Sequence, residues 1–230
     1  MTLQQLPLNV QLPANETFAT LVAGPNEEAI KLARGEHSSD ASLVYLWGRQ
    51  GVGKSHLLHA TCAAAQEQVM YLPLAELRDT VAAQVLRGLE VYPWLCLDDI
   101  DAVIADENWC FELFALLNRV RDQHRPSRVL VTACSSPAQL AAAYPDVQSR
   151  LSWGVVVQLH SLIDDDKVKA LQVRAHAMGL ELRDDAAQFM VQRLGRDLVS
   201  LIHCLERLDH ASIAAQRKLT IPFVKAVLAI

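Results

Sequence analysis

The chain has 230 residues, 51% of them hydrophobic and 20% charged, and a formal net charge of −5. This composition is typical of a folded globular protein with one large or two small domains, and the acidic balance argues against a general duplex-binding surface. No apolar run reaches the roughly 18 residues of a membrane span, and the N-terminus lacks the pattern of a secretory signal. Five widely spaced cysteines without a C-x-x-C pair predict free thiols in a reducing cytoplasm.

The N-terminal part is predicted to hold little regular structure. Residues 1–16 carry Pro7 and Pro13 and show no helical periodicity, so we expect an extended tail. A short helix over residues 27–34 is predicted after the start signal at Gly24–Asn26.

From residue 43 onwards, short apolar runs of strand length alternate with helix-like stretches. This alternation predicts a parallel sheet with helices on both faces. The predicted strands are residues 43–47, 69–72, 94–97, 128–132 and 155–159, and the predicted helices between them are residues 54–66, 74–86 and 108–125.

After residue 159 the strand pattern stops and helices follow. Their predicted ranges are residues 164–178, 184–194 and 197–216, and a short last helix opens at Ile221 with Thr220 as its N-cap. The predicted organisation is therefore a tail (1–16), an α/β nucleotide-binding domain (17–160) and a helical domain (161–230).

A phosphate-binding loop follows the first predicted strand. Residues 48–55 read Gly-Arg-Gln-Gly-Val-Gly-Lys-Ser and fit the pattern G-x-x-x-x-G-K-[ST] between a strand and a helix. This arrangement directs backbone N–H groups and a helix N-terminus at a polyphosphate. Lys54 is predicted to contact the β- and γ-phosphates, and the Ser55 hydroxyl to bind Mg²⁺. The residues predicted to bind the nucleotide here are Gly48, Gly51, Val52, Gly53, Lys54, Ser55 and His56.

Two acidic residues follow the third predicted strand. Asp98 and Asp99 come after four apolar residues, which is the Walker B pattern that places a carboxylate beside Mg²⁺. We expect Asp98 to hold the hydration shell of Mg²⁺ and Asp99 to polarise the attacking water. The alternative is a strand that ends in a solvated acidic turn, since Asp101 follows. The P-loop upstream favours the functional interpretation.

Two further positions carry weaker signals. At the end of the strand over residues 128–132, Thr132, Cys134 or Ser135 could orient a water beside the γ-phosphate, although none is a strong hydrogen-bonding acid or amide. Arg150 is either an ordinary surface charge or a planar cation that reaches the γ-phosphate of its own or a neighbour's nucleotide. Composition alone favours the surface charge.

The order of these pieces resembles AAA+ ATPases, and most specifically their DnaA branch. Residues 149–154, Ser-Arg-Leu-Ser-Trp-Gly, resemble the Ser-Arg-Phe-Gly-Trp-Gly stretch of the initiator DnaA, and residues 15–18 with Gly24 resemble the DnaA segment beside the adenine. The resemblance implies an α/β P-loop AAA+ domain with a five-stranded parallel sheet, a small helical lid domain, and a bound ADP or ATP with Mg²⁺.

Within this branch the chain resembles the short DnaA-homologous regulators of replication initiation. It begins near the ATPase domain and ends after the lid, so we expect no DnaA-type helix-turn-helix domain and no direct sequence-specific DNA binding. Residues 5–10 resemble the hexapeptide with which such regulators bind the DNA polymerase sliding clamp. Without the family, the same residues read as a disordered tail or a strand lying on the domain. The predicted clamp-binding residues are Gln5, Leu6, Pro7, Leu8, Asn9 and Val10.

The resemblance implies that the protein inhibits DNA replication by inactivating DnaA. Loaded on the clamp, it would meet ATP-bound DnaA and promote hydrolysis of that ATP, with Arg150 acting in trans as an arginine finger. Its own nucleotide, with ADP as the activating form, would set the angle between the two domains. The implied partners are the clamp and DnaA, with homo-oligomers as an option and no membrane.

Two positions depart from the DnaA pattern. Val199 aligns with the lid arginine that senses the γ-phosphate in DnaA, and Arg196, one helical turn earlier, could compensate and contact the nucleotide. Cys134 stands where DnaA has an aspartate. Both changes predict weak or no intrinsic ATPase activity. The alternatives that stay open are an autonomous AAA+ ATPase of the helicase-loader type, and an adaptor in which Arg150 has no catalytic role.

Overall fold

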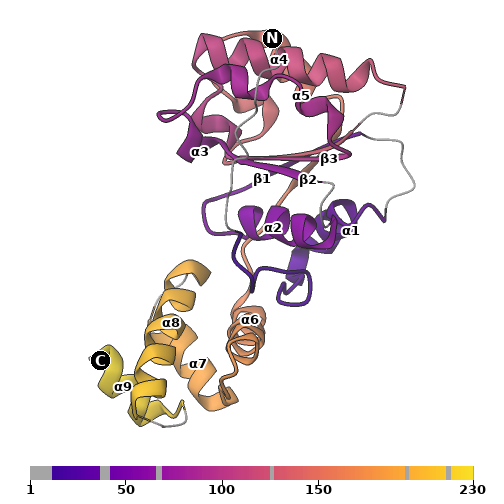
Figure 1. The fold of residues 1–230 in the computed structure, drawn as a ribbon. Coiled ribbons are helices and arrows are strands. Elements are labelled where there is room, and N and C mark those ends of the chain that lie inside the picture. The colour runs from indigo at the N-terminus through magenta and orange to yellow at the C-terminus, as the bar shows by residue number, and fades with distance from the viewer. Residues whose placement is uncertain are drawn as a thin grey trace.

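The computed structural model describes residues 12–36, 42–65, 69–124, 127–194, 197–215 and 219–229. Its central feature is a five-stranded parallel sheet with the strand order β2-β3-β4-β1-β5 (Figure 1), which confirms the predicted α/β fold. The middle of β1 is buried on both faces, as is typical of parallel strands covered by helices. The strands are β1 (Leu43–Trp47), β2 (Val69–Pro73), β3 (Trp94–Asp98), β4 (Arg128–Ala133) and β5 (Val155–Gln158).

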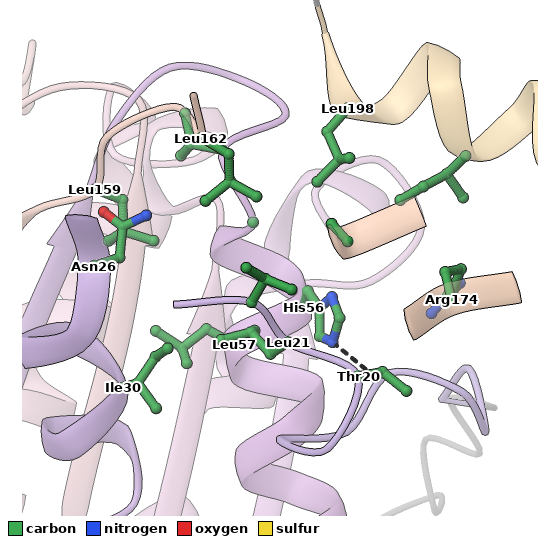
Figure 2. A pocket seen from close by; sticks show the side chains of 15 residues that line it. Thr20, Leu21, Asn26, Ile30, His56, Leu57, Leu159, Leu162, Arg174 and Leu198 are labelled. Carbon is green, nitrogen blue, oxygen red and sulfur yellow. Dashed lines mark hydrogen bonds between the residues drawn. The ribbon is translucent and has the colours of Figure 1, made fainter. Parts of the chain in front are cut away.

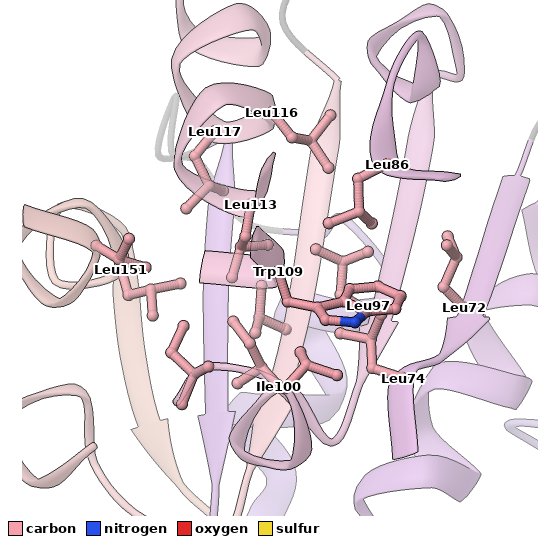
Figure 3. Packing of buried hydrophobic residues seen from close by; sticks show 14 of the residues in the cluster. Leu72, Leu74, Leu86, Leu97, Ile100, Trp109, Leu113, Leu116, Leu117 and Leu151 are labelled. Atoms are coloured by element: carbon pink, nitrogen blue, oxygen red, sulfur yellow. The ribbon is translucent and has the colours of Figure 1, made fainter. Parts of the chain in front are cut away.

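Helices cover both faces of the sheet (Figure 1). On one face, Trp109, Leu113 and Leu116 point from α4 towards the strands and pack with Leu97 (Figure 3). The first turn of α4 is capped by Asp106, whose carboxylate accepts hydrogen bonds from two backbone N–H groups. The helices on this face are α3 (Leu74–Leu77), α4 (Glu107–Arg121) and α5 (Pro145–Leu151), and those on the other are α1 (Glu27–Ala33) and α2 (Lys54–Ala65).

The prediction of a single helix over residues 74–86 is wrong. The structure has a one-turn helix, α3, and a separate 3-10 helix at Ala83–Leu86. The Thr80 hydroxyl donates to the backbone oxygens of Glu76 and Leu77, both at 3.2 Å. Such local bonds compete with continuation of a helix. The next helix, α4, also ends at Arg121, earlier than the predicted residue 125.

The helical lid follows β5 and has its own core (Figure 1). Phe223 and Val224 of the last helix belong to one buried cluster with residues of the other three lid helices. Thr220 occupies the N-cap position of that helix without a side-chain capping bond. Across the described parts of the chain, no helix has the length and apolar character to cross a membrane. The lid helices are α6 (Asp164–Ala177), α7 (Asp184–Arg193), α8 (Leu198–Ala215) and α9 (Ile221–Leu228).

Candidate nucleotide-binding site

The P-loop connects the C-terminal end of β1 to the N-terminus of α2. Gly51 and Gly53 have φ angles of +80° and +99°, which residues with a Cβ atom rarely adopt. Gly48 is required for another reason, because a Cβ atom there would lie 2.6 Å from the backbone oxygen of Leu159. The glycines of the motif therefore shape this turn directly.

A cavity of about 580 Å³, the phosphate cavity, lies over the P-loop. Lys54, the first residue of α2, is 6% exposed, and its Nζ donates to the backbone oxygens of Gly48 at 3.1 Å and Arg49 at 3.4 Å. A helix N-terminus beside a buried ammonium group attracts an anion. The lining residues are Glu16, Gln50, Gly51, Gly53, Lys54, Ser55, His56, His59, Ala75, Asp99, Asp101, Ala102, Cys134, Leu198, Val199 and Ile202.

The residues of the P-loop motif that were predicted to bind the nucleotide differ in where they lie. Most of them line the phosphate cavity, whereas Gly48 contributes the carbonyl that accepts from Lys54, and Val52 lines an apolar pocket next door. Gly51 and Gly53 of the loop and the first turn of α2 are thus the parts of the motif that face the cavity.

The acidic side of the site is held by Thr132 of β4. Its hydroxyl donates to Asp98 and accepts from the backbone N–H of Asp99 at 2.9 Å. The other carboxylate oxygen of Asp98 accepts from the Tyr71 hydroxyl at 2.8 Å, and Asp98 is 4% exposed. Asp98 is absent from the cavity lining, where Glu16, Asp99 and Asp101 provide the carboxylates. In this structure Asp98 links β2 and β4 through hydrogen bonds to Tyr71 and Thr132 and does not line the cavity.

The donor set of the cavity fits Mg²⁺. The Ser55 hydroxyl and the carboxylates of Asp99 and Asp101 line the same space, and hard oxygen ligands are those that Mg²⁺ prefers. Cys134 lies on the same rim, with its Sγ 3.8 Å from Lys54 Nζ. Thr132 supports the strand end instead of facing the cavity, so Cys134 is the residue of this strand end that lines it.

Burial perturbs the groups at this rim. It raises the pKa of Asp99, the nearby charge of Asp98 raises it further, and the Lys54 ammonium opposes both effects. Burial also raises the pKa of the Cys134 thiol, again against the charge of Lys54. Asp99 is therefore a stronger base than an exposed aspartate, as activation of a water requires.

An apolar pocket, the base pocket, adjoins the phosphate cavity (Figure 2). The two spaces share Gly53, His56, Leu198 and Ile202. Figure 2 shows Leu21, Ile30 and Leu57 on the α/β side of the pocket and Leu198 on the lid side. An apolar pocket beside a phosphate site suits a planar base. Of the residues that line this pocket, the sequence predicted Val52, Gly53 and His56 to bind the nucleotide. Residues 15–18, predicted to lie beside the adenine, are not among the lining residues.

The N-terminal segment, residues 12–23, is anchored to α2. The Nε2 atom of His56 lies 3.2 Å from the backbone oxygen of Thr17 and 3.3 Å from Thr20 Oγ1, and His59 Nδ1 lies 2.6 Å from Glu16 Oε2. Burial opposes ionisation of Glu16, but the hydrogen bond to His59 and nearby positive charges outweigh it and lower its pKa. Asn15 and Glu16, predicted to belong to an extended tail, are therefore packed on the domain.

The lid residue aligned with the DnaA arginine reaches the phosphate cavity. Val199 is 45% exposed, lines the cavity, and has its Cγ2 3.2 Å from where a Cβ of Gly51 would lie. An alkyl group thus occupies this wall. Arg196 lies outside the described residues, so its predicted role stays a prediction, and the same holds for the clamp-binding residues 5–10.

Arg150 lies away from the phosphate cavity. It belongs to α5, its Cζ is 3.6 Å from the ring centroid of Trp153, and it lines a different cavity of about 240 Å³ together with Leu43 and Val129. Arg150 is therefore not placed to act on the nucleotide of its own chain.

Sequence reasoning missed Arg174 of α6. This residue is 6% exposed and lines the base pocket. It follows the buried Leu171 by three positions and so shares its face of the helix, but nothing in the sequence names its partners. Its partners are the backbone oxygen of Asn15 and the carboxylate of Glu16, which lie far away in the sequence.

Comparison with known proteins agrees with the predicted resemblance. The family model of the bacterial DnaA ATPase domain matches residues 12–158, and the model of the Hda lid domain matches residues 164–228. Domain III of DnaA from Thermotoga maritima superimposes with a TM-score of 0.80 at 20% identity, covering 95% of this chain and 98% of that one. AMPPCP-bound DnaA from Aquifex aeolicus gives 0.65 at 18% identity, with 85% and 65% covered.

The fold is shared more widely. The RuvB Holliday junction branch migration motor of Thermotoga maritima gives a TM-score of 0.70 at 16% identity, covering 95% of this chain and 72% of that one. At these identities the structural matches show the fold alone, whereas the two family models together span most of the chain.

Proposed function

Because this chain belongs to the bacterial DnaA ATPase-domain family and carries an Hda-type lid, we propose that it is a negative regulator of replication initiation. It binds ADP or ATP with Mg²⁺, associates with the polymerase sliding clamp, and promotes hydrolysis of the ATP bound to DnaA. Arg150 acts in this reaction in trans.

The observation that carries the proposal is the position of Arg150. The residue is absent from the lining of its own phosphate cavity and lies beside exposed aromatic surface at Trp153. A guanidinium group is planar, permanently charged and suited to phosphate oxygens. Placed on a partner's γ-phosphate, such a finger raises hydrolysis by roughly 10³–10⁵-fold in other nucleotide hydrolases.

The nucleotide of the chain itself has a structural role in this proposal. Both cavities are walled by residues of the α/β domain and by Leu198 and Ile202 of α8. A bound nucleotide therefore contacts both domains and stabilises one lid position. Val199 offers no charge to a γ-phosphate, which supports ADP as the resident and activating form.

The clamp-binding part of the proposal rests on the sequence of residues 5–10. An extended peptide with one glutamine and spaced apolar side chains can dock into a preformed apolar pocket. Gln5 orients the peptide by hydrogen bonds, and Leu6 and Leu8 fill apolar subsites.

The central experiment measures hydrolysis of DnaA-bound ATP in the presence of DNA-loaded clamp. Arg150→Ala is expected to abolish stimulation while ADP affinity, unfolding and clamp binding stay unchanged. Arg183→Ala, an exposed arginine of the lid, is the matched control and should retain stimulation. Full stimulation by the Arg150 variant would refute the proposal.

A second experiment tests the tail. Replacing Gln5 and Leu6 by alanine should remove clamp pull-down without changing nucleotide affinity. Clamp binding that survives this double substitution would contradict the assignment of residues 5–10.

A second candidate function is an autonomous ATPase of the helicase-loader type. The observation that favours it is Asp99, which lines the phosphate cavity with a raised pKa and could act as a base. Turnover by the chain alone above about 1 s⁻¹, at the low end of ordinary enzymes, would support this function over the regulator.

A further inference from the structure

One indole ring contacts two guanidinium groups at the surface that carries Arg150. The Cζ atom of Arg150 lies 3.6 Å from the ring centroid of Trp153, and that of Arg121, the last residue of α4, lies 4.1 Å from it. Trp153 is 51% exposed, and all three side chains line the cavity of about 240 Å³. Two cations and one aromatic ring thus share one partly exposed site.

Neither arginine is neutralised by a carboxylate within 4.0 Å in the described part of the chain. Arg119, two positions before Arg121 on α4, pairs with Glu90 at 3.0 Å, and Arg87 pairs with the buried Glu112. Arg150 has no such pair, and its Nε is buried without a hydrogen-bond acceptor. Two unpaired cations held close together raise the electrostatic free energy of the free protein.

We propose that the cluster of Arg121, Trp153 and Arg150 is a two-cation site for the polyphosphate of a nucleoside triphosphate bound to a partner protein. The inference rests on the proposed function and deepens it. Trp153 is a positioning residue that holds Arg150 by stacking on its guanidinium group, and Arg121 supplies a second positive charge to the same anion.

The physical case is one of complementarity. A polyphosphate offers several negative oxygens, so two cations bind it better than one, and its arrival relieves the repulsion between Arg121 and Arg150. Stacking on the indole keeps the Arg150 side chain in place before the anion arrives. Phe114, whose ring centroid lies 5.4 Å from Arg150 Cζ, adds a second aromatic contact.

The proposed roles predict different kinetic effects. Misplacement of a finger lowers turnover in the assembled complex, since reacting groups tolerate little displacement. Loss of the second cation, Arg121, weakens association and makes it less dependent on salt, because this charge acts mainly by attracting the approaching anion.

The test measures stimulated hydrolysis of DnaA-bound ATP against the concentration of the full-length chain. Trp153→Ala should lower the maximal rate about tenfold or more with little change in half-saturation, and Trp153→Phe should retain about a third or more of it. Arg121→Gln should raise the half-saturating concentration about fivefold or more and flatten its salt dependence. Arg183→Gln serves as the control. ADP affinity and thermal unfolding report on folding, and Trp153→Leu replaces the alanine variant if that one unfolds.

The outcomes separate this inference from the proposed function. Retained stimulation in Arg150→Ala would refute the function itself. Lost stimulation in Arg150→Ala, together with equal maximal rates for the alanine (or leucine) and phenylalanine variants of Trp153, would overturn the positioning role alone. An Arg121→Gln variant that matches the unsubstituted protein at every salt concentration would overturn the second cation.

Discussion

Arg174 of the lid helix α6 donates a hydrogen bond from Nη1 to the backbone oxygen of Asn15 at 2.7 Å, across 159 positions of sequence. Its Nη2 lies 3.5 Å from Glu16 Oε1, and Glu16 also contacts His59 of α2. The N-terminal segment is therefore tied to the α/β domain and to the lid at once. Because Arg174 also lines the base pocket, the lid position and the nucleotide site share one set of contacts.

Removing this link should loosen the lid. Arg174→Met keeps the apolar stem but removes the ion pair with Glu16 and the hydrogen bond to the oxygen of Asn15, which then keeps only the Thr20 hydroxyl as a donor. We therefore expect the free energy of unfolding to fall by about 1–3 kcal/mol. ADP affinity should fall as well. Urea unfolding and calorimetry check both effects, with Arg183→Met, an exposed lid arginine, as control. Equal stability of the two variants would contradict the proposed link.

Thr132 is predicted to hold the acidic side of the site through its hydroxyl. Thr132→Val keeps the shape but leaves Asp98 and the N–H of Asp99 each short of one partner, which should cost about 1–3 kcal/mol of stability. Thr61→Val is the matched control, because the equally buried Thr61 hydroxyl donates only to the carbonyls of Leu57 and Ala33. Its loss should cost about 1 kcal/mol or less. Urea unfolding measures the loss of stability in both variants, and equal losses would contradict the role assigned to Thr132.

Asp99 is predicted to reduce stability at neutral pH. Its pKa is raised in the folded state, so the folded protein binds the proton more tightly than the unfolded chain does. Stability therefore falls as the pH rises from the unfolded pKa, about 3.9 for an aspartate, through the raised folded pKa, and the penalty is complete above it. Asp99→Asn should remove this part of the pH dependence and raise the free energy of unfolding at pH 7.

Asparagine is the appropriate replacement at this position. Asp99 has a φ of +53°, and asparagine adopts that backbone region more easily than alanine does. Unfolding by urea from pH 4 to pH 7 checks the prediction. Asp79→Asn, at a side chain that is 83% exposed, should leave the profile unchanged. A parallel profile for Asp99→Asn and the unsubstituted protein would contradict it.

Val199 is predicted to limit discrimination between ATP and ADP. Val199→Arg would place a guanidinium group at the cavity wall near Gly51, where it can donate to a γ-phosphate. One charge-assisted hydrogen bond of this kind favours a triphosphate over ADP by roughly tenfold. Calorimetric titration with AMPPCP and with ADP measures the ratio, and Val199→Leu controls for size. An equal change in both affinities would speak against the assignment of this lid position.

Much of the fold could be predicted from the sequence because its signals are local. Five apolar runs at Leu43, Val69, Trp94, Arg128 and Val155 mark the strands, and the intervening helical patterns require a parallel sheet. The P-loop was predictable for the same reason, since its glycines and Lys54 are adjacent in sequence. The stretch at residues 74–86 was not, because the Thr80 hydroxyl bonds to the carbonyls of the preceding turn, which competes with helix continuation.

The α/β P-loop architecture with a helical lid and the chemistry of a phosphate site could thus be predicted from the sequence, because they follow from periodicity and from residues within one motif. The packing of the folded chain was needed to show that Asp98 bonds to Tyr71 and Thr132 without lining the cavity, while Asp99 and Asp101 face the cavity. It also shows that Arg174 reaches Asn15, and that Arg121 and Arg150 meet on Trp153. Such contacts depend on how separate elements pack. The spacing of residues along the chain does not predict the distance between side chains of different elements.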